Sequence, residues 1–372
     1  MSNTKRTSYS QNSTYISCPK HWFWKYIEKL SAPQEGASLS FGTAMDNAIM
    51  ALLEGKSNYL DILDRSMLSQ WNFGKTTQVF DNPDIVYSYA DFDEYILEQE
   101  DIIEMAKWAV DLKLSGAAVA PSREDLVNLF KQVAKTKKNP YKRLSQAQMT
   151  YFNRCSWLSL KRKGHLLIEA FKVQFLPKVK NVLATQERAS IKDPNTGDSI
   201  QGYIDMVLEI EGYDKPVIFD LKTAARPYTE EQIELGAQLT LYAGMNGGKY
   251  NTDLVGYVVL CKNIEKIEDS KCKTCGHTKT GRHKTCDNII NGQRCEGEWL
   301  TKKIPKPNVQ VLVKQKTQQE INDLFMDVGN ILVAMKQEIV YKDISKCNNW
   351  FGSKCPYYDA CHHNDTSGLK KR

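Results

Sequence analysis

The chain has 372 residues, of which 41% are hydrophobic, enough to bury the core of two or three folding units. Its formal net charge of +6 permits an anionic partner without requiring one. The sequence has no run of about 18 apolar residues that would span a membrane. The polar segment MSNTKRTSYSQNST predicts no signal peptide, so we expect a cytoplasmic protein without a membrane partner.

The first half of the chain is predicted to be mainly helical. Apolar and aromatic residues recur at helical spacing from about 9 to 30, and a second helix is expected from 42 to 55. Long helical patterns then fill the region from about 91 to 183. These patterns divide this half into N-terminal helices at 1–55 and a helical domain at 56–183.

The pattern changes to strands at about Ala184. QERASIKD, the hairpin GYIDMVLEIEGYDKPVIFDLK and LVGYVVLCK are predicted strands, and EEQIELGAQLTLYAGMN is a predicted helix between them. We therefore predict an α/β core at 184–265, followed by a cysteine-rich insert at 266–304. The strand NVQVLVKQK and a long amphipathic helix occupy 305–345, and a second cysteine-rich segment occupies 346–372.

Two carboxylates and an amine mark the predicted hairpin. Asp205 lies on its first strand, and Asp220 and Lys222 lie on its second. A turn tip at Gly212 and Tyr213 would set Asp205 opposite Asp220, whereas a tip one residue later would set it opposite Lys222. Because side chains alternate faces along a strand, either register places all three on one face.

These three residues have the chemistry of metal-dependent phosphodiester cleavage. Asp205, Asp220 and the backbone carbonyl of Leu221 are hard oxygen ligands for Mg²⁺ or Mn²⁺. Lys222 would orient the attacking water and offset charge at the phosphate. A carboxylate pair on a hairpin also has a purely structural interpretation. The apolar run VIF before Asp220 favours the site, since a buried carboxylate beside a buried lysine is costly unless it is paired or metal-bound.

Several motifs resemble those of a known family. GYID, FDLKT and QLTLY resemble the hairpin, D-x-K and Q-x-x-x-Y motifs of the RecB-like branch of the PD-(D/E)xK nucleases. SYSQNSTYISCPKHWFWKY is similar to the segment that opens iron-sulfur members of that branch, which include CRISPR adaptation nucleases and AddB-type and phage-encoded exonucleases. FGTAMDNAI is similar to the G-T-x-x-H helix that precedes the core. The resemblance touches 9–55, 185–262 and 345–363, and implies a restriction-endonuclease-like fold, a mixed sheet flanked by helices.

The resemblance also implies roles for individual residues. Asp46 stands where the family usually has a histidine metal ligand. Aspartate is a harder ligand than imidazole and can bind Mg²⁺, although a solvated helix face is the alternative. Gln238 and Tyr242, four apart on one helix face, would contact the hairpin or the DNA near the scissile phosphate, or else form a polar helix edge. Glu187 matches an often acidic family position and is the weakest candidate.

Three cysteines lie close together near the end of the chain: Cys347, Cys355 and Cys361. Three thiolates need a fourth to hold a [4Fe-4S] cluster, and the resemblance implies that Cys18 in the CP motif supplies it. Such a cluster would join the first helix to the final segment as a structural clasp. The competing interpretation is a Zn²⁺ site with His362 or His363 as the fourth ligand.

The insert carries four cysteines of its own: Cys272, Cys275, Cys286 and Cys295. Their C-x2-C and C-x8-C spacing predicts a zinc ribbon, because thiolate coordination lets a short, core-poor segment fold. His283 could replace Cys295 as the fourth ligand. The insert is also basic, which indicates contact with nucleic-acid backbone or a partner, or simply a solvated surface.

Together these features predict a metal-dependent DNA nuclease that leaves 5′-phosphate and 3′-hydroxyl ends, as the resemblance implies. Exonuclease action on single strands or duplex ends is favoured, because relatives thread a strand through a helical arch. The chain has no helicase motif, so a helicase or recombination protein is the candidate partner. Recombination, replication or end processing, and a phage origin, follow from the resemblance alone. The rival prediction is a nuclease-fold DNA-binding or scaffold protein without catalysis, for which Asp46 is the main argument.

Overall fold

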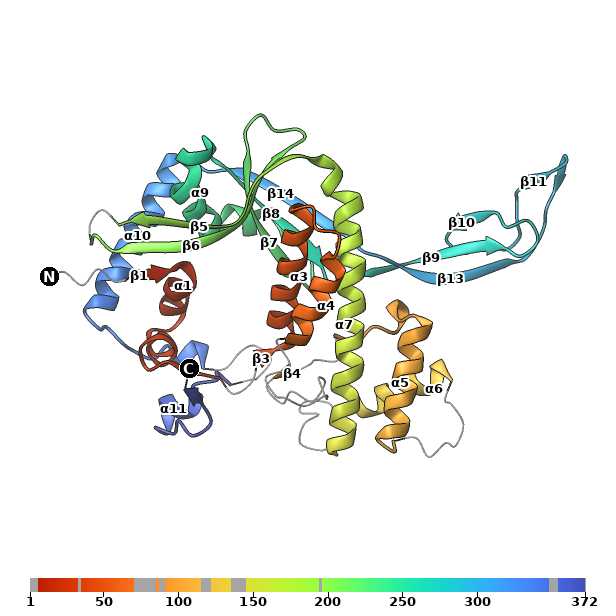
Figure 1. The fold of residues 1–372 in the computed structure, drawn as a ribbon, viewed down its shortest axis with the longest axis horizontal. Coiled ribbons are helices and arrows are strands. Elements are labelled where there is room, and N and C mark those ends of the chain that lie inside the picture. The colour runs from red at the N-terminus through yellow and green to blue at the C-terminus, as the bar shows by residue number, and fades with distance from the viewer. Residues whose placement is uncertain are drawn as a thin grey trace.

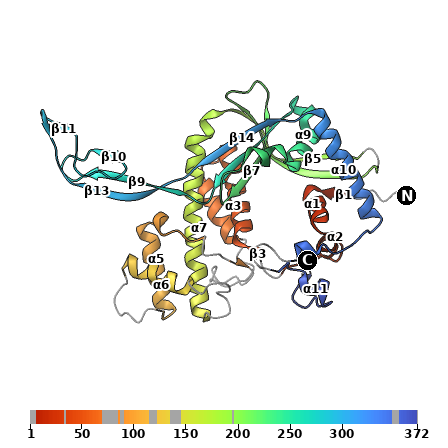
Figure 2. The same ribbon diagram turned by 180° about the vertical axis from the view of Figure 1, so that it is seen from behind.

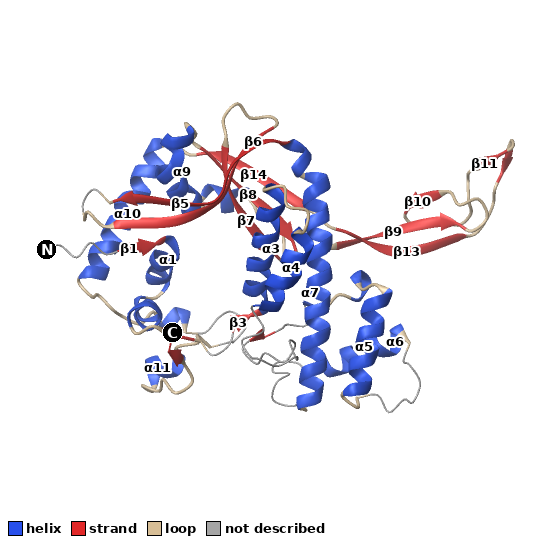
Figure 3. Ribbon diagram, viewed as in Figure 1, coloured by secondary structure: helices blue, strands red, loops and turns tan. Residues whose placement is uncertain are grey.

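The computed structural model describes most of the chain as well-defined helices and strands. The described residues are 6–32, 35–69, 85–86, 91–114, 122–134, 145–193, 196–347 and 354–371. The order of helices and strands is mixed, as Figures 1 and 3 show. Among the described helices, none combines the length and the apolar composition that a membrane crossing requires.

A six-stranded mixed sheet forms the centre of the protein. Its strands are β1 (Arg6–Ser8), β5 (Val179–Lys192), β6 (Ser199–Ile210), β7 (Val217–Ala224), β8 (Leu254–Cys261) and β14 (Val309–Gln315). The path runs β1-β6-β7-β8-β14, and β5 also pairs with β6. The β1–β6 and β7–β8 pairs are parallel and the others are antiparallel. The predicted α/β core with a mixed sheet is therefore confirmed.

Helices cover both faces of this sheet because neighbouring residues of its strands point to opposite sides. Met206 and Phe219 pack with α3 (Ala37–Leu53), α4 (Tyr59–Ser69) and α7 (Gln146–Gln174). Val207 and Ile218 pack on the other side with α8 (Glu230–Glu234), α9 (Ala237–Tyr250) and α10 (Gln318–Lys336). The helices α5 (Gln99–Asp111) and α6 (Arg123–Ala134) extend the first layer along α7. The sheet is thus a middle layer between two helical layers.

Two predicted helices differ from the structure: one ends earlier than expected and the other is broken into shorter pieces. The helical pattern expected to continue to residue 183 stops at Gln174, and β5 begins at Val179 after the 3-10 turn Leu176–Lys178. Pro177 removes a backbone donor there, and the β-branched residues that follow pair with β6 instead. The helix expected from 9 to 30 is broken into α1 (Tyr9–Ser17), α2 (Pro19–Trp22) and the π-helix Phe23–Ile27. The break falls at Cys18, which is extended and precedes Pro19.

The insert forms an arm that extends away from the body, as Figures 1 and 2 show from opposite sides. Its strands are β9 (Glu265–Cys272), β10 (Thr278–Thr280), β11 (Ile289–Ile290), β12 (Gln293–Arg294) and β13 (Trp299–Lys306). β9 and β13 pair antiparallel along their full length. At the far end, Asn291 and Gly292 both have positive φ, which a tight hairpin turn requires.

Short elements complete the described chain. They are the strands β2 (Leu30–Ser31), β3 (Glu35–Gly36), β4 (Ile85–Val86) and β15 (Lys370–Lys371), the 3-10 turns Glu94–Ile96 and Ile344–Lys346, and α11 (Tyr358–His362). β15 pairs with β2, so the C-terminal segment returns to the N-terminal helices.

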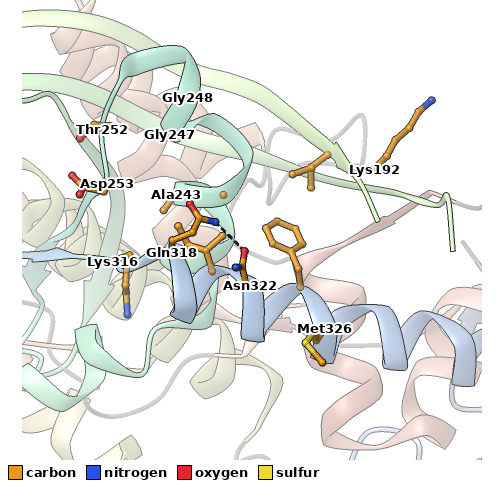
Figure 4. A pocket seen from close by; sticks show the side chains of 14 residues that line it. Lys192, Ala243, Gly247, Gly248, Thr252, Asp253, Lys316, Gln318, Asn322 and Met326 are labelled. Carbon is orange, nitrogen blue, oxygen red and sulfur yellow. Dashed lines mark hydrogen bonds between the residues drawn. The ribbon is translucent and has the colours of Figure 1, made fainter. Parts of the chain in front are cut away.

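A cavity of about 730 Å³ lies between α9, α10 and the end of β5 (Figure 4). Gly244 of α9 allows the close approach of α10, since a Cβ there would lie 2.4 Å from Phe325. Gln318 and Asn322 line the cavity and share a hydrogen bond of 2.9 Å. None of the candidate catalytic residues lines it.

Candidate active site

The β6–β7 hairpin adopts the first of the two expected registers. Met206 pairs with Phe219 and Leu208 with Val217, and one further step sets Asp205 opposite Asp220. The connection spans 211–216 rather than a two-residue turn. The Oδ2 of Asp205 accepts a hydrogen bond of 2.7 Å from the backbone N–H of Leu221.

Lys222 is held by partners on a strand and a helix. Its Nζ lies 2.6 Å from Oδ2 of Asp220 and donates to Oε1 of Gln238 at 3.2 Å. The Nε2 of Gln238 in turn donates to the hydroxyl of Tyr242 at 2.8 Å. Asp220 and Lys222 face α9 because they alternate with the buried Leu221, and Gln238 and Tyr242 share one face of α9. The three strand residues and these two helix residues thus form one connected group.

Asp46 reaches the same place from α3. Its Oδ2 accepts a hydrogen bond of 2.6 Å from Nε2 of Gln186 on β5. Its Oδ1 is buried and accepts no hydrogen bond from any residue that the structure describes. Burial raises the pKa of Asp46 to about 6, the Gln186 hydrogen bond opposes that rise, and the charge of Asp220 adds to it. The carboxylate therefore keeps one oxygen free for a cation.

The carboxylates of Asp46, Asp205 and Asp220 repel one another in this site. Burial, followed by repulsion from Asp220 and Asp46, raises the pKa of Asp205 to about 8. Burial also raises the pKa of Asp220, although Lys222 lowers it in part. Burial opposes the charge of Lys222, but the attraction of Asp220 outweighs this and raises the pKa of the amine. Three carboxylates with a single ammonium group leave negative charge uncompensated, and carboxylate oxygens are the ligands that Mg²⁺ and Mn²⁺ prefer. The oxygens of the three carboxylates do not all lie within 4.8 Å of one another, so binding one shared cation would require these side chains to move closer together.

Glu187, the remaining acidic candidate, is bound by residues outside the carboxylate site. The carboxylate of Glu187 is bound by Lys249 and Tyr250, and it has no contact with Asp46 among those described. The backbone carbonyl of Leu221 remains a predicted ligand.

Sequence reasoning missed Gln186 and Tyr257. Tyr257 lies opposite Asp220 in the β7–β8 register, and the charge of Asp220 adds to burial in raising the pKa of its phenol. The place of Tyr257 in a predicted strand next to the hairpin could have indicated it. Gln186 gives no such signal, since a polar residue in a strand is unremarkable in sequence.

The four cysteines of the insert meet in one cluster. Their sulfur atoms all lie within 4.8 Å of one another, with Cys272 and Cys295 at 3.7 Å and Cys275 and Cys286 at 3.6 Å. A tetrahedral ion with bonds of about 2.3 Å would set its thiolates about 3.8 Å apart. His283 points elsewhere, with its Nε2 2.9 Å from the carbonyl of Thr280.

The thiols of this cluster favour different charge states. Backbone N–H groups, that of Cys275 first, lower the pKa of Cys272 to about 6, and the N–H of His277 lowers the pKa of Cys275. Burial raises the pKa of Cys286 to about 12. Four adjacent thiols cannot all ionise without a cation to offset the charge, so the cluster fits a metal ion.

The other four candidate cysteines line one cavity of about 230 Å³: Cys18, Cys347, Cys355 and Cys361. No three of these four sulfur atoms lie within 4.8 Å of one another, so this group is more open than the cluster of the insert. The indole N–H of Trp24 donates to Sγ of Cys361 at 3.2 Å. His362 lies 3.4 Å from Sγ of Cys347, whereas His363 lies 3.9 Å from Asp359. The donor set fits a thiolate-bound group, and His362 keeps the zinc alternative open.

Comparison with known proteins places the chain in a family. The model of the PD-(D/E)XK nuclease superfamily matches residues 6–362. No curated protein matches the chain significantly. The matched range includes the sheet, the hairpin carboxylates and Lys222, so the match and the geometry of the site agree. The chain therefore belongs to the PD-(D/E)XK nuclease superfamily.

Proposed function

We propose that this protein is a Mg²⁺- or Mn²⁺-dependent deoxyribonuclease of the RecB-like branch that acts as an exonuclease. The observation that carries the proposal is the convergence of Asp46, Asp205 and Asp220 around the amine of Lys222. A relative without catalysis would gain nothing from keeping three repelling carboxylates and a lysine in one buried site. The family match supports the nuclease class, and the exonuclease action rests on the resemblance of the motifs.

The cation would be held by Asp46, Asp205, Asp220 and the carbonyl of Leu221. It would supply Lewis-acid chemistry, activating water and offsetting charge on the phosphate. Lys222 is placed to hold the attacking water, because Asp220 and Gln238 fix its amine from two sides. Water attacks phosphorus and the bond to the 3′ oxygen breaks, which leaves a 5′-phosphate and a 3′-hydroxyl.

The test is a cleavage assay on labelled single-stranded and duplex DNA with wild type and Lys222→Ala. We expect Mg²⁺-dependent shortening from an end by wild type and a loss of roughly 10²–10³-fold or more in the variant. Equal activity in both proteins would remove the enzyme hypothesis and leave a DNA-binding or scaffold protein. A circular substrate separates exonuclease from endonuclease action, since an exonuclease leaves it intact.

For the insert we propose a structural Zn²⁺ bound by Cys272, Cys275, Cys286 and Cys295. The short sulfur distances and the lowered pKa of Cys272 support this ion. The segment 266–304 contains nine Lys or Arg against five Asp or Glu, a net +4 out of +6 for the whole chain. This excess supports a role for the arm in contacting the nucleic-acid backbone.

For the terminal cysteines we propose a [4Fe-4S] cluster that ties Cys18 to the last segment. Their wider spacing and common cavity support a group larger than one ion. Anaerobic purification should give a brown protein with absorption near ~400 nm and about four irons per chain. A colourless protein whose only metal is zinc would support His362 as the fourth ligand instead.

The biological context rests on resemblance alone. We place the activity in recombination, replication or end processing, with a helicase or recombination protein supplying the unwound strand, and with a phage-encoded protein as the expected source.

A further inference from the structure

Four lysines line a cavity of about 290 Å³ between α7 and the base of the arm: Lys131, Lys163, Lys262 and Lys266. Among the described residues that line it, the carboxylates are those of Asp93 and Glu94. Glu94 pairs with Lys131 at 2.9 Å, and Asp93 pairs with Lys266. The cavity therefore has more ammonium groups than carboxylates in its wall, and it is separate from the metal-binding carboxylates.

Lys262 connects this cavity to the candidate active site. Its backbone N–H donates to the carbonyl of Ala224 at the end of β7, two residues beyond Lys222. Its Nζ donates to the hydroxyl of Ser38 on α3 at 2.8 Å. Ser38 lies eight residues before Asp46, which is about 12 Å along a helix axis. The cavity thus lies within a few nucleotides of the site of cleavage.

The lysines themselves favour an anion. Burial lowers the pKa of Lys262 and of Lys163, and the nearby carboxylate of Asp91 opposes the fall in both. For Lys163, Asp93 also opposes the fall, whereas the charges of Lys266 and Lys262 add to it. Lys163 is almost fully buried, so bulk water does little to stabilise its charge. A phosphate group in the cavity would add to the stabilisation that Asp93 and Asp91 supply.

We propose that this cavity binds a phosphate of the DNA strand whose scissile bond lies at Asp46, Asp205 and Asp220. The proposal rests on the proposed function for its ligand, although its chemistry is that of any phosphate. A backbone contact on this side would set the path of the strand between the carboxylates and the basic arm, and would add affinity without sequence preference.

The test is the salt dependence of DNA binding by a Lys222→Ala background without divalent ions, which separates binding from cleavage. Adding Lys262→Ala should lower the slope of log affinity against log salt by about 0.7–0.9, the value of one phosphate contact. The matched control is Lys215→Ala, which removes the same charge at the opposite end of β7, where Lys215 pairs with Asp253 at 3.0 Å. The slope of the control should change by less than about 0.2.

Equal slopes for the two variants, or no DNA binding by the background protein, would overturn the proposal. Binding of inorganic phosphate or pyrophosphate that Lys262→Ala abolishes, with an unchanged DNA slope, would assign the cavity to a free phosphate compound instead. A protein that binds DNA with the expected slopes but cuts none would refute the proposed nuclease and leave this contact standing.

A second inference comes from the backbone of β5. Thr185 pairs with Met206 and Glu187 with Ile204, so Gln186 lies opposite Asp205. Its φ is +48°, a left-handed conformation that is disfavoured for a residue with a side chain in the middle of a strand. With this backbone, the amide of Gln186 donates to Oδ2 of Asp46. Oδ1 of Asp46 has no donor among the described residues.

The geometry points to Gln186 as the residue that positions the carboxylate of Asp46 for binding the cation. This inference also rests on the proposed function. A neutral amide fixes the carboxylate without competing for the metal, and loss of such a partner typically weakens metal binding by 10–100-fold. The strained backbone is the cost of directing the amide across the site.

Gln186→Gly separates the backbone strain from the hydrogen bond to Asp46, because glycine favours the positive φ but has no side-chain amide. We expect an unchanged or higher Tm, together with Mn²⁺ binding, measured by electron paramagnetic resonance, that is at least tenfold weaker. Gln186→Asn keeps an amide on a residue that tolerates this backbone, and it should fall between glycine and wild type. An unchanged Mn²⁺ affinity in the glycine variant, or a sharply lower Tm, would show that Gln186 has only a structural role.

Discussion

The carboxylate site and the cysteine cluster of the arm differ in where their ligands come from. Asp46, Asp205 and Asp220 come from α3, β6 and β7, and only the packing of the whole body brings them together. The four cysteines lie within one short insert, and local turns bring their sulfur atoms within 4.8 Å. The first site depends on the fold, whereas the second is a condition for its own segment to fold. Metal removal should therefore unfold the arm but leave the body folded.

The largest expected effect is on the arm. Cys272→Ser should abolish zinc binding, and with it an apparent free energy of about 10 kcal/mol or more that holds the insert folded. We expect the arm to become sensitive to protease while the body stays resistant, with zinc measured by atomic absorption. His283→Ala is the matched control and should retain one zinc. Zinc loss in His283→Ala, with zinc kept in Cys295→Ser, would identify the histidine as the fourth ligand.

At the carboxylate site, a substitution should weaken function while strengthening the fold. Asp205→Asn removes a charge that Asp220 and Asp46 repel, and its amide oxygen can still accept from Leu221 N–H. We expect roughly 10²–10³-fold less Mg²⁺-dependent cleavage, but a higher Tm than wild type at pH 8 in chelator. A lower Tm in the variant would mean that the carboxylates do not repel one another in the folded protein.

The same repulsion predicts a pH dependence of stability in the metal-free body. The folded pKa values of about 6 for Asp46 and about 8 for Asp205 exceed the unfolded value of about 3.9. The unfolded chain therefore loses these protons first, so the contribution of these two groups to the free energy of unfolding is largest below about pH 4 and falls as pH rises towards 8. Each unmatched proton contributes a slope of about 1.4 kcal/mol per pH unit.

Urea unfolding in chelator from pH 5 to 8 measures this slope. Asp205→Asn should show a clearly smaller slope than wild type, and saturating Mg²⁺ should reduce the slope of wild type. Identical slopes in wild type and variant would contradict the raised pKa of Asp205.

Sequence patterns predicted the parts of the fold that depend on neighbours in the chain. The strand LVGYVVLC, the hairpin and the cysteine spacing of the insert all follow from local periodicity and turns, and the structure has them. The break at Cys18 could also have been predicted, since Pro19 follows it. The early end of α7 was missed because Val179 and its neighbours fit a helix or a strand equally well until β6 is present to pair with them.

Contacts between distant elements were less accessible from sequence. The placement of Asp46 beside the hairpin followed from family resemblance, not from any local pattern. Gln186 was missed because its role depends on a backbone angle and on a partner on another element. The lysine cavity was missed because its residues come from four separate parts of the chain.

The most direct test of the central claim is a crystal of the full chain soaked in Mn²⁺ and measured for anomalous scattering at the manganese edge. We expect at least one strong peak in contact with carboxylate oxygens of Asp46, Asp205 and Asp220, with the amine of Lys222 nearby. A map without a peak there, or a peak that Asp46 and Asp220 do not contact, would contradict it.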